Sequence, residues 1–229
     1  AKLGFTQSYT YFTWRTQKWE LEQYLTELTG YPERDYYRPN FFVNTPDILP
    51  YHLQSGERWM FKSRAALAAT LSSTYGVYSG FELLEHIPIP GKEEYLDSEK
   101  YEIKVRDWDK PGNIKSYLGD LNRARRDNAA LQQTSNLHFL PVEDNNIIAF
   151  VKESVNQTNS VIAAIALSRD VHEFWLPLGD IQVGMAGDRR NVAAVENLMT
   201  GERYPVEWGG IRLRIDPVRD PALLFRCLA

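Results

Sequence analysis

The feature that most constrains the fold is a change of pattern near Thr134 in a chain of 229 residues. Before this point, stretches typical of strands alternate with helical stretches; after it, short β stretches follow one another with turn residues between them. Strand–helix alternation favours a parallel sheet, whereas closely spaced short strands favour an antiparallel sandwich. The pattern therefore predicts an α/β part over residues 1–134 and an all-β part over residues 135–229.

The first part contains three strand–helix units. Apolar residues at spacings of three and four predict helices over residues 17–28, 56–73 and 114–132, and β-rich runs predict strands over residues 5–12, 37–43 and 75–78. A closed (β/α)8 barrel takes about 250 residues, and three units alone leave an open sheet edge. Either the sheet is small and open, or the units belong to a larger barrel.

The second part reads as about seven short strands. Asp144-Asn145-Asn146 and Gly209-Gly210 are typical of hairpin turns. We therefore expect an antiparallel β-sandwich. Its clearest strands are predicted over residues 137–140, 147–151, 160–167, 172–176, 192–196 and 211–215.

Composition argues against several classes of partner. The net charge is −4 and no Lys/Arg stripe is present, so we expect neither nucleic acid nor an anionic membrane surface as a partner. No apolar window is long enough for a membrane span. The single cysteine, Cys227, excludes an internal disulfide and suits a reducing, cytoplasmic compartment. We expect no metal site and no cofactor.

Two places in the first part could carry chemistry. Asp47 leaves the predicted strand 37–43 through the turn Asn44-Thr45-Pro46, and reacting groups in α/β enzymes lie at the carboxyl ends of parallel strands. A simple turn or cap residue is the competing interpretation. Lys100 and Tyr101, adjacent in a long irregular stretch, could present an ammonium and a phenol to a phosphate, or could belong to a solvated loop.

Three segments closely resemble the GlgE-type maltosyltransferases of the α-amylase superfamily: residues 3–15 (LGFTQSYTYFTWR), 38–50 (RPNFFVNTPDILP) and 94–102 (EYLDSEKYE). Residues 121–131 (LNRARRDNAAL) also resemble the last barrel helix of amylases. The resemblance is specific up to about residue 134 and loose beyond it.

The resemblance implies an α/β plus all-β fold, in which residues 1–134 are the C-terminal portion of a (β/α)8 TIM barrel and residues 135–229 an antiparallel β-sandwich domain. It implies transfer of maltosyl units from α-maltose 1-phosphate to α-1,4-glucan. Asp47 matches the catalytic carboxylate that stabilises the transition state, and Lys100 and Tyr101 match contacts to maltose 1-phosphate. Amylases have Asn-His-Asp where this chain has Thr45-Pro46-Asp47, which argues against a plain amylase.

By the same resemblance, the nucleophilic Asp and the acid/base Glu lie upstream of Ala1. A retaining mechanism needs both carboxyl groups, so we expect the isolated chain to be inactive and its N-terminus to be a cut. Barrel strands without their neighbours expose edges and apolar surface, so we also expect self-association. A homodimer is expected from the resemblance.

Two alternatives remain open at this point. One is an α-amylase-like glycoside hydrolase or a trehalose-synthase relative. The other, of a different class, is a non-catalytic glucan-binding module, which would show an exposed aromatic pair such as Trp175 with Tyr204 or Trp208. Against that module, we expect Trp175 and Trp208 to lie in the core or at the interface between the two parts.

Overall fold

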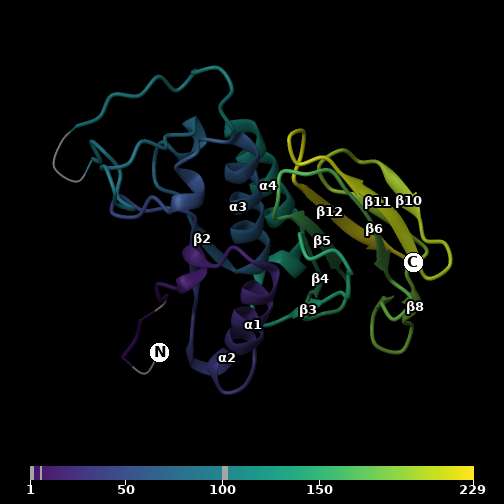
Figure 1. Ribbon diagram of the computed structural model, residues 1–229. Helices are drawn as coiled ribbons and strands as arrows, with labels where there is room; N and C mark the ends of the chain where they lie inside the picture. Colours follow the sequence, from purple (N-terminus) through teal and green to yellow (C-terminus); the bar gives the residue numbers. More distant parts are fainter. Residues whose placement is uncertain (1–2, 6, 100–102) are drawn as a thin grey trace.

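The computed structural model describes residues 3–5, 7–99 and 103–229. Its longer helices gather in one half of the molecule and its antiparallel strands in the other (Figure 1). The helices are α1 (Lys18–Thr29), α2 (Glu33–Tyr36), α3 (Arg58–Leu71) and α4 (Lys115–Asp127), and the 3-10 turns are η1 (Tyr11–Trp14), η2 (Tyr51–Leu53), η3 (Phe81–Leu83) and η4 (Ala129–Gln132). Within the described ranges, no helix is both long and apolar enough to cross a membrane.

The first half contains parallel pairing, as the strand–helix alternation predicts. Strand β1 (Asn40–Phe42) runs parallel to β2 (Thr74–Gly76). On the other side of β1, the backbone N–H of Ser8 donates to the Arg38 carbonyl at 2.7 Å, and Asn40 N–H donates to the Ser8 carbonyl at 3.0 Å. Three successive segments therefore point their carboxyl ends in one direction.

Two predictions for this half need correction. The described part of the strand predicted over residues 5–12 pairs only at Ser8, because the Thr10 hydroxyl accepts from Phe12 N–H and the chain turns into η1. The helix predicted over residues 114–132 ends at Asp127. There Asn128 is extended and its side-chain amide donates to the Ala124 carbonyl at 2.9 Å, replacing a helical hydrogen bond.

The second half is antiparallel. Its main sheet has the strand order β10-β9-β12-β5-β4-β3, and β11 pairs with β6 and β7 with β8. The last strand, β12, lies in the middle of this sheet although the predicted strands did not include it. The bounds are β3 (Leu137–Phe139), β4 (Ile147–Glu153), β5 (Ser160–Ala166), β6 (His172–Pro177), β7 (Gln182–Val183), β8 (Arg190–Asn191), β9 (Ala194–Asn197), β10 (Arg203–Pro205), β11 (Gly210–Ile215) and β12 (Ala222–Leu228).

The six-stranded sheet is shared by two apolar cores. On one face, Phe150 and Ile165 pack into a cluster that also contains α3 and β1. On the other face, Ile162 packs with Phe174 and Leu213, which lie on β6 and β11. Strands β4 and β5 are therefore buried on both faces, and their near-continuous apolar sequence reflects this.

Helix α3 is buried around most of its circumference and is linked to the antiparallel sheet by polar groups. The Ser63 hydroxyl donates to the Ala166 carbonyl at 2.7 Å, and the Lys62 ammonium donates to the Arg219 carbonyl at 2.7 Å. These bonds supply partners for polar groups that the apolar surroundings would otherwise leave unsatisfied.

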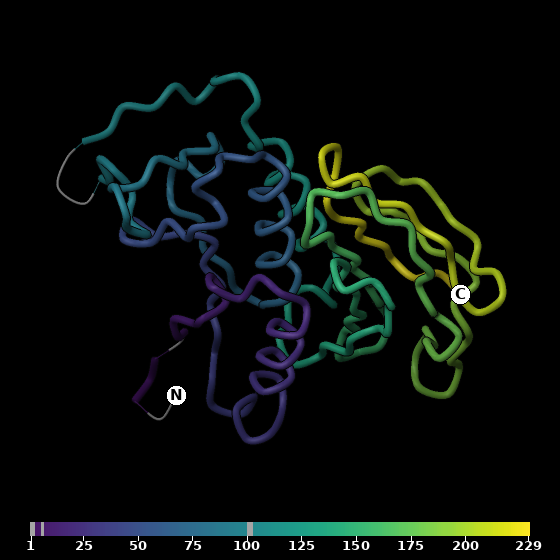
Figure 2. The backbone as a smooth tube through the Cα atoms, viewed as in Figure 1, coloured from purple at the N-terminus to yellow at the C-terminus, as the bar shows by residue number. Residues whose placement is uncertain are grey.

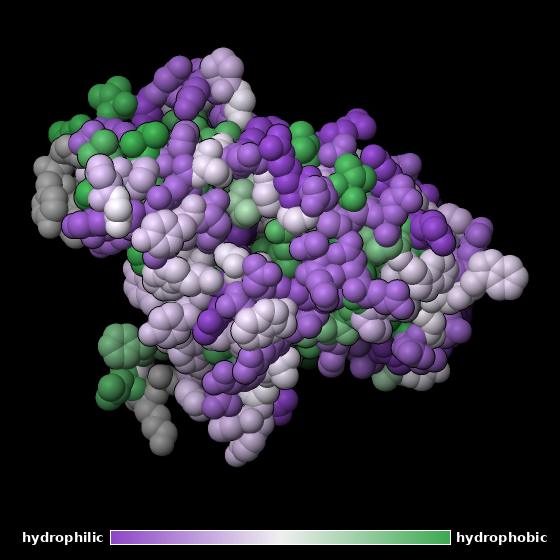
Figure 3. Space-filling model, viewed as in Figure 1, coloured by the Kyte–Doolittle hydropathy of each residue, from purple (hydrophilic) through white to green (hydrophobic). Residues whose placement is uncertain are grey.

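A long segment between η3 and α4 extends away from the helices and returns to them (Figure 2). Ile87, Ile103 and Val105 lie on it, and the last two are 95 % and 93 % exposed. On the face in Figure 3, apolar groups gather over this segment while most of the remaining surface is hydrophilic. The segment thus carries apolar side chains into solvent.

The Lys152 side chain provides a test of the packing between α3 and the sheet. It is fully buried, and its ammonium donates to the carbonyls of Thr70 at 3.1 Å, Leu71 at 3.4 Å and Gln133. Burial lowers the pKa of Lys152 to about 7. We expect Lys152→Ala to lower the free energy of unfolding by about 3 kcal/mol, because three buried carbonyls lose their donor and a cavity remains.

Urea unfolding followed by circular dichroism measures this change. Lys92→Ala, at an exposed lysine, is the matched control and should change the free energy by no more than about 0.5 kcal/mol. Equal stability of the two variants would show that the buried ammonium does not hold α3 against the sheet.

Candidate active site

The candidate site lies where the parallel strands β1 and β2 end. Asp47 follows β1 in a tight turn closed by Thr45 and Ile48, each of which donates its N–H to the other's carbonyl at 3.1 Å. The Asp47 side chain is exposed. The strand leading to it pairs in parallel, as the proposed role of this carboxylate requires.

The turn that carries Asp47 is anchored by Asn44, a fully buried residue that directly follows Val43. The Asn44 amide donates to the Tyr95 hydroxyl at 2.7 Å and accepts from the Tyr78 N–H at 2.9 Å. Burial raises the pKa of Tyr95, so its hydroxyl keeps its proton. One amide therefore joins the ends of β1 and β2 to the long segment that follows η3.

Glu93 makes a second connection between the long segment and the strand ends. Its backbone carbonyl accepts from Leu49 N–H at 2.8 Å, and its carboxylate accepts from Tyr51 N–H at 3.0 Å and from the Trp14 indole at 3.2 Å. Trp14 and Tyr51 are 40 % and 64 % exposed. The Trp14 indole and the backbone of Tyr51 are thus held beside the turn that contains Asp47.

Lys100 and Tyr101, the predicted phosphate contacts, lie outside the described residues. The residues on either side of them are fixed. Arg106 pairs with Glu99 at 2.8 Å and with Glu85 at 2.9 Å, and Lys104 pairs with Glu85 at 3.0 Å. The Tyr78 hydroxyl accepts from Glu99 N–H at 3.0 Å, which ties the same stretch to the end of β2.

The ion pairs around Arg106 are well protected from solvent, since its side chain is 3 % exposed. Burial alone would lower the pKa of Arg106, but the hydrogen bonds to Glu99 and Glu85 raise it above the ordinary value. Gly80, with φ +98°, allows this arrangement, because a Cβ there would lie 2.3 Å from the Glu85 carboxylate. Glu85, Arg106 and Asn44 were not among the predicted site residues; of the three, Asn44 had a positional signal, since it directly follows the predicted strand.

The arrangement places an exposed carboxylate in a turn whose neighbours are held by hydrogen bonds and ion pairs. Glu85, Glu93 and Glu99 are each engaged by donors, and Asp47 lies exposed in the turn that follows β1. An exposed carboxylate in this position can face a developing cationic sugar. Among the described residues, no group of three His, Cys, Asp or Glu side chains is arranged to hold a metal ion.

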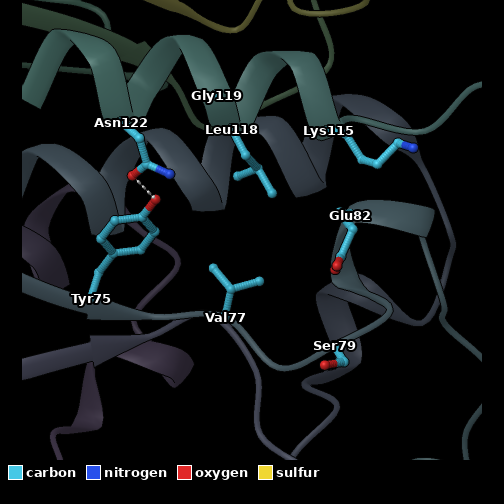
Figure 4. A pocket seen from close by; sticks show the side chains of 8 residues that line it. All are labelled: Tyr75, Val77, Ser79, Glu82, Lys115, Leu118, Gly119 and Asn122. Carbon is cyan, nitrogen blue, oxygen red and sulfur yellow. Dashed lines mark hydrogen bonds between the residues drawn. The ribbon is translucent and has the colours of Figure 1, made fainter. Parts of the chain in front are cut away.

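A hollow of about 610 Å³ lies beside the site, between β2 and α4 (Figure 4). Val77 and Leu118 face each other across it, and the Tyr75 hydroxyl closes one end by donating to the Asn122 side-chain oxygen at 2.6 Å. Tyr75, Val77 and Ser79, which alternate along β2 and the residues after it, line one side of the hollow, and α4 lines the other.

Another set of reactive residue types lies in the second half. His172 is hydrogen bonded to Asp144 at 2.7 Å and to the Ser168 hydroxyl at 2.8 Å. The His172 side chain is buried, and the Ser168 oxygen also accepts from Asp170 N–H at 3.4 Å in its own turn. These hydrogen bonds therefore join the turn before β4 to the turn after β5.

The sequence has close relatives of known name. It is 46 % identical to the alpha-1,4-glucan:maltose-1-phosphate maltosyltransferase of Rhodospirillum rubrum, over 99 % of this chain and 33 % of the relative. The protein of the same name from Chlorobaculum tepidum is 47 % identical, over 99 % of this chain and 35 % of its own length. The chain thus spans about a third of these curated relatives, in their C-terminal portion. No protein-family model matches it.

Solved structures place the fold among the α-amylases. The α-amylase of Geobacillus thermoleovorans, solved with acarbose, has a TM-score of 0.66 and 13 % identity, and the match covers 93 % of this chain and 44 % of the amylase. That likeness supports the fold alone. The family is shown by the sequence identities of 46 % and 47 % over practically the whole chain. The chain belongs to the α-1,4-glucan:maltose-1-phosphate maltosyltransferase family.

Proposed function

We propose that this chain is the C-terminal part of an enzyme that transfers maltosyl units from α-maltose 1-phosphate to α-1,4-glucan. The observation that carries the proposal is the position of Asp47 at the carboxyl end of a parallel strand, in a chain 46 % identical over 99 % of its length to a protein named for this activity. The turn sequence Thr45-Pro46-Asp47 separates it from the amylase pattern.

The proposed architecture has two domains. Residues 1–134 form the C-terminal portion of a (β/α)8 barrel, and residues 135–229 form a β-sandwich. Parallel pairing of β1 with β2 supports the first domain, and β2, as an end strand of the described two-stranded sheet, leaves a place for the further neighbour that a closed barrel needs. The shared apolar core between the six-stranded sheet and β6–β11 supports the second.

In the proposed reaction, Asp47 stabilises the oxocarbenium-like transition state and Lys100 and Tyr101 hold the phosphate of the donor. The nucleophile and the acid/base are supplied by the remainder of the parent protein, as are the other walls of the sugar pocket around Asp47. The isolated chain is then inactive. The reaction takes place in the cytoplasm, where the lone thiol of Cys227 stays reduced.

Removing the Asp47 charge should slow the reaction. In the parent enzyme, we expect Asp47→Asn to lower kcat by about 10²–10³, the usual effect of losing one group that stabilises transition-state charge. Phosphate released from α-maltose 1-phosphate in the presence of glycogen is the measurement. Asp109→Asn, at a side chain that is 98 % exposed, is the control and should leave the rate unchanged. A parent enzyme that releases no phosphate refutes the transferase, and a fully active Asp47→Asn variant refutes the role of this carboxylate.

The ion pairs around Glu85 should affect binding of the donor more than the chemical step. We expect Glu85→Ala to raise the KM for α-maltose 1-phosphate about tenfold or more, since it releases Lys104 and Arg106 and loosens the segment that contains Lys100 and Tyr101. Steady-state kinetics of the parent enzyme test this. Glu94→Ala, which removes only an exposed pair with Lys92, should leave KM unchanged. An unchanged KM in Glu85→Ala would show that the ion pairs of Glu85 do not contribute to donor binding.

We also propose that the chain self-associates, as a homodimer in the parent family. Ile103 and Val105 offer nearly fully exposed aliphatic surface on the long segment. Light scattering of the 229-residue chain should give a mass of at least two copies, and the double variant Ile103→Ser/Val105→Ser should shift it toward one copy. A monomeric wild-type chain at high concentration would refute self-association.

A further inference from the structure

Trp208 occupies a turn position that its side chain does not favour. Glu207 and Gly210 exchange both backbone hydrogen bonds at 3.0 Å, so Trp208 and Gly209 are the two central residues of a tight turn. Their φ angles are +53° and +77°. Turns with positive φ at both central residues favour Asn-Gly, and a bulky side chain there is strained.

Packing of the Trp208 indole against the rest of the chain does not compensate for this strain. It is 96 % exposed, so almost none of its apolar surface is removed from water. Strained, exposed aromatic residues concentrate at sites where a ligand supplies the missing contacts. A ligand that covers the indole would therefore explain why a tryptophan occupies this position.

A hollow of about 390 Å³ lies beside Trp208, and Trp175, Tyr204 and Arg212 also line it. Its volume is within the usual range of small-ligand sites. Trp175 and Arg212 are direct neighbours across β6 and β11 and also line a second hollow of about 670 Å³. Trp175, which is 42 % exposed, thus stands between two adjoining hollows on the solvent side of these strands.

The Trp175 ring has a fixed orientation. It lies over the backbone of Gly210, where a Cβ would come within 2.5 Å of the indole. Part of the ring is therefore covered by the strand, and the rest is open to a ligand. The expectation that Trp175 and Trp208 lie in the core or at the interface between the two parts is wrong: both are exposed on the outer side of β6–β11, across the sheet from α3.

Polar groups around these rings suit hydroxyl-rich ligands. The Tyr204 hydroxyl donates to Glu202 at 2.6 Å, and burial together with Glu202 raises the pKa of Tyr204 to about 12, so this phenol stays protonated. Glu207 and Arg212 add an acceptor and a donor to the hollow. Sugar rings have apolar faces that stack on aromatic rings and equatorial hydroxyls that need such partners.

We propose that Trp208, Trp175 and Arg212 form a surface binding site for an α-1,4-glucan chain, with the two indoles as stacking platforms and Arg212 as a donor to sugar hydroxyls. The preference for an α-1,4-glucan over other sugars rests on the proposed function. A second copy of the chain or another protein seated on the same rings is the competing occupant.

The test is calorimetric titration of the 229-residue chain with maltoheptaose. We expect binding by the wild type, and weakening by about tenfold or more in Trp208→Asn, equivalent to at least about 1.4 kcal/mol. Thermal stability of this variant should equal or exceed that of the wild type, because Asn-Gly suits the turn. Trp175→Ala should weaken binding as well. Trp108→Asn, at a tryptophan that is 45 % exposed on the long segment, is the control and should bind normally.

Three results would overturn the site: no binding of maltoheptaose by the wild type, full binding by both Trp208→Asn and Trp175→Ala, or equal loss in Trp108→Asn. If a second copy of the chain occupies these rings instead, light scattering would show that Trp208→Asn dissociates a dimer, and the titration would show unchanged sugar binding. The titration involves no catalysis. A parent enzyme that releases no phosphate, with a chain that still binds maltoheptaose, would refute the transferase and leave the surface site standing.

Discussion

The structure depends on a sheet that is covered on both faces. Strands β4 and β5 send alternate side chains into two cores, one shared with α3 and β1 and the other with β6 and β11. Either face, if uncovered, would expose a continuous apolar surface. The two halves of the chain therefore cannot separate without a large loss of buried area, and the carboxyl ends of β1 and β2 keep a fixed position relative to the outer strands.

Periodicity in the sequence predicts those parts of the fold in which burial has a regular pattern. Helices α1 and α3 and strands β4 and β5 follow from it within a few residues. The strand expected over residues 5–12 fails because Thr10 caps a turn, a local hydrogen bond that competes with pairing. Strand β12 was missed although its sequence is apolar, since nothing local shows that residues 222–228 insert between β9 and β5.

The candidate site shows the same division. Asp47 could be found because it follows a strand and matches a family motif. The groups that hold its surroundings could not: Asn44 meets Tyr95 across 51 positions, and Arg106 meets Glu85 across 21 positions. Such partners are brought together by the chain's path through the long segment, which has no periodicity to reveal it. Candidate catalytic residues are thus easier to nominate from the sequence than the residues around them.

The proposed surface site would act through polymer length. A binding site on β6 and β11 holds a glucan chain while its free end explores the neighbourhood, which converts a second encounter into an intramolecular one. The gain requires a chain long enough to pass around the sheet between the outer strands and the ends of β1 and β2. Because the two cores fix that separation, a short oligosaccharide bound at Trp208 cannot also reach the ends of β1 and β2, whereas a long glucan gains the full effective concentration there. Under the proposed function, a strained, exposed tryptophan at this position would favour long glucans over short ones.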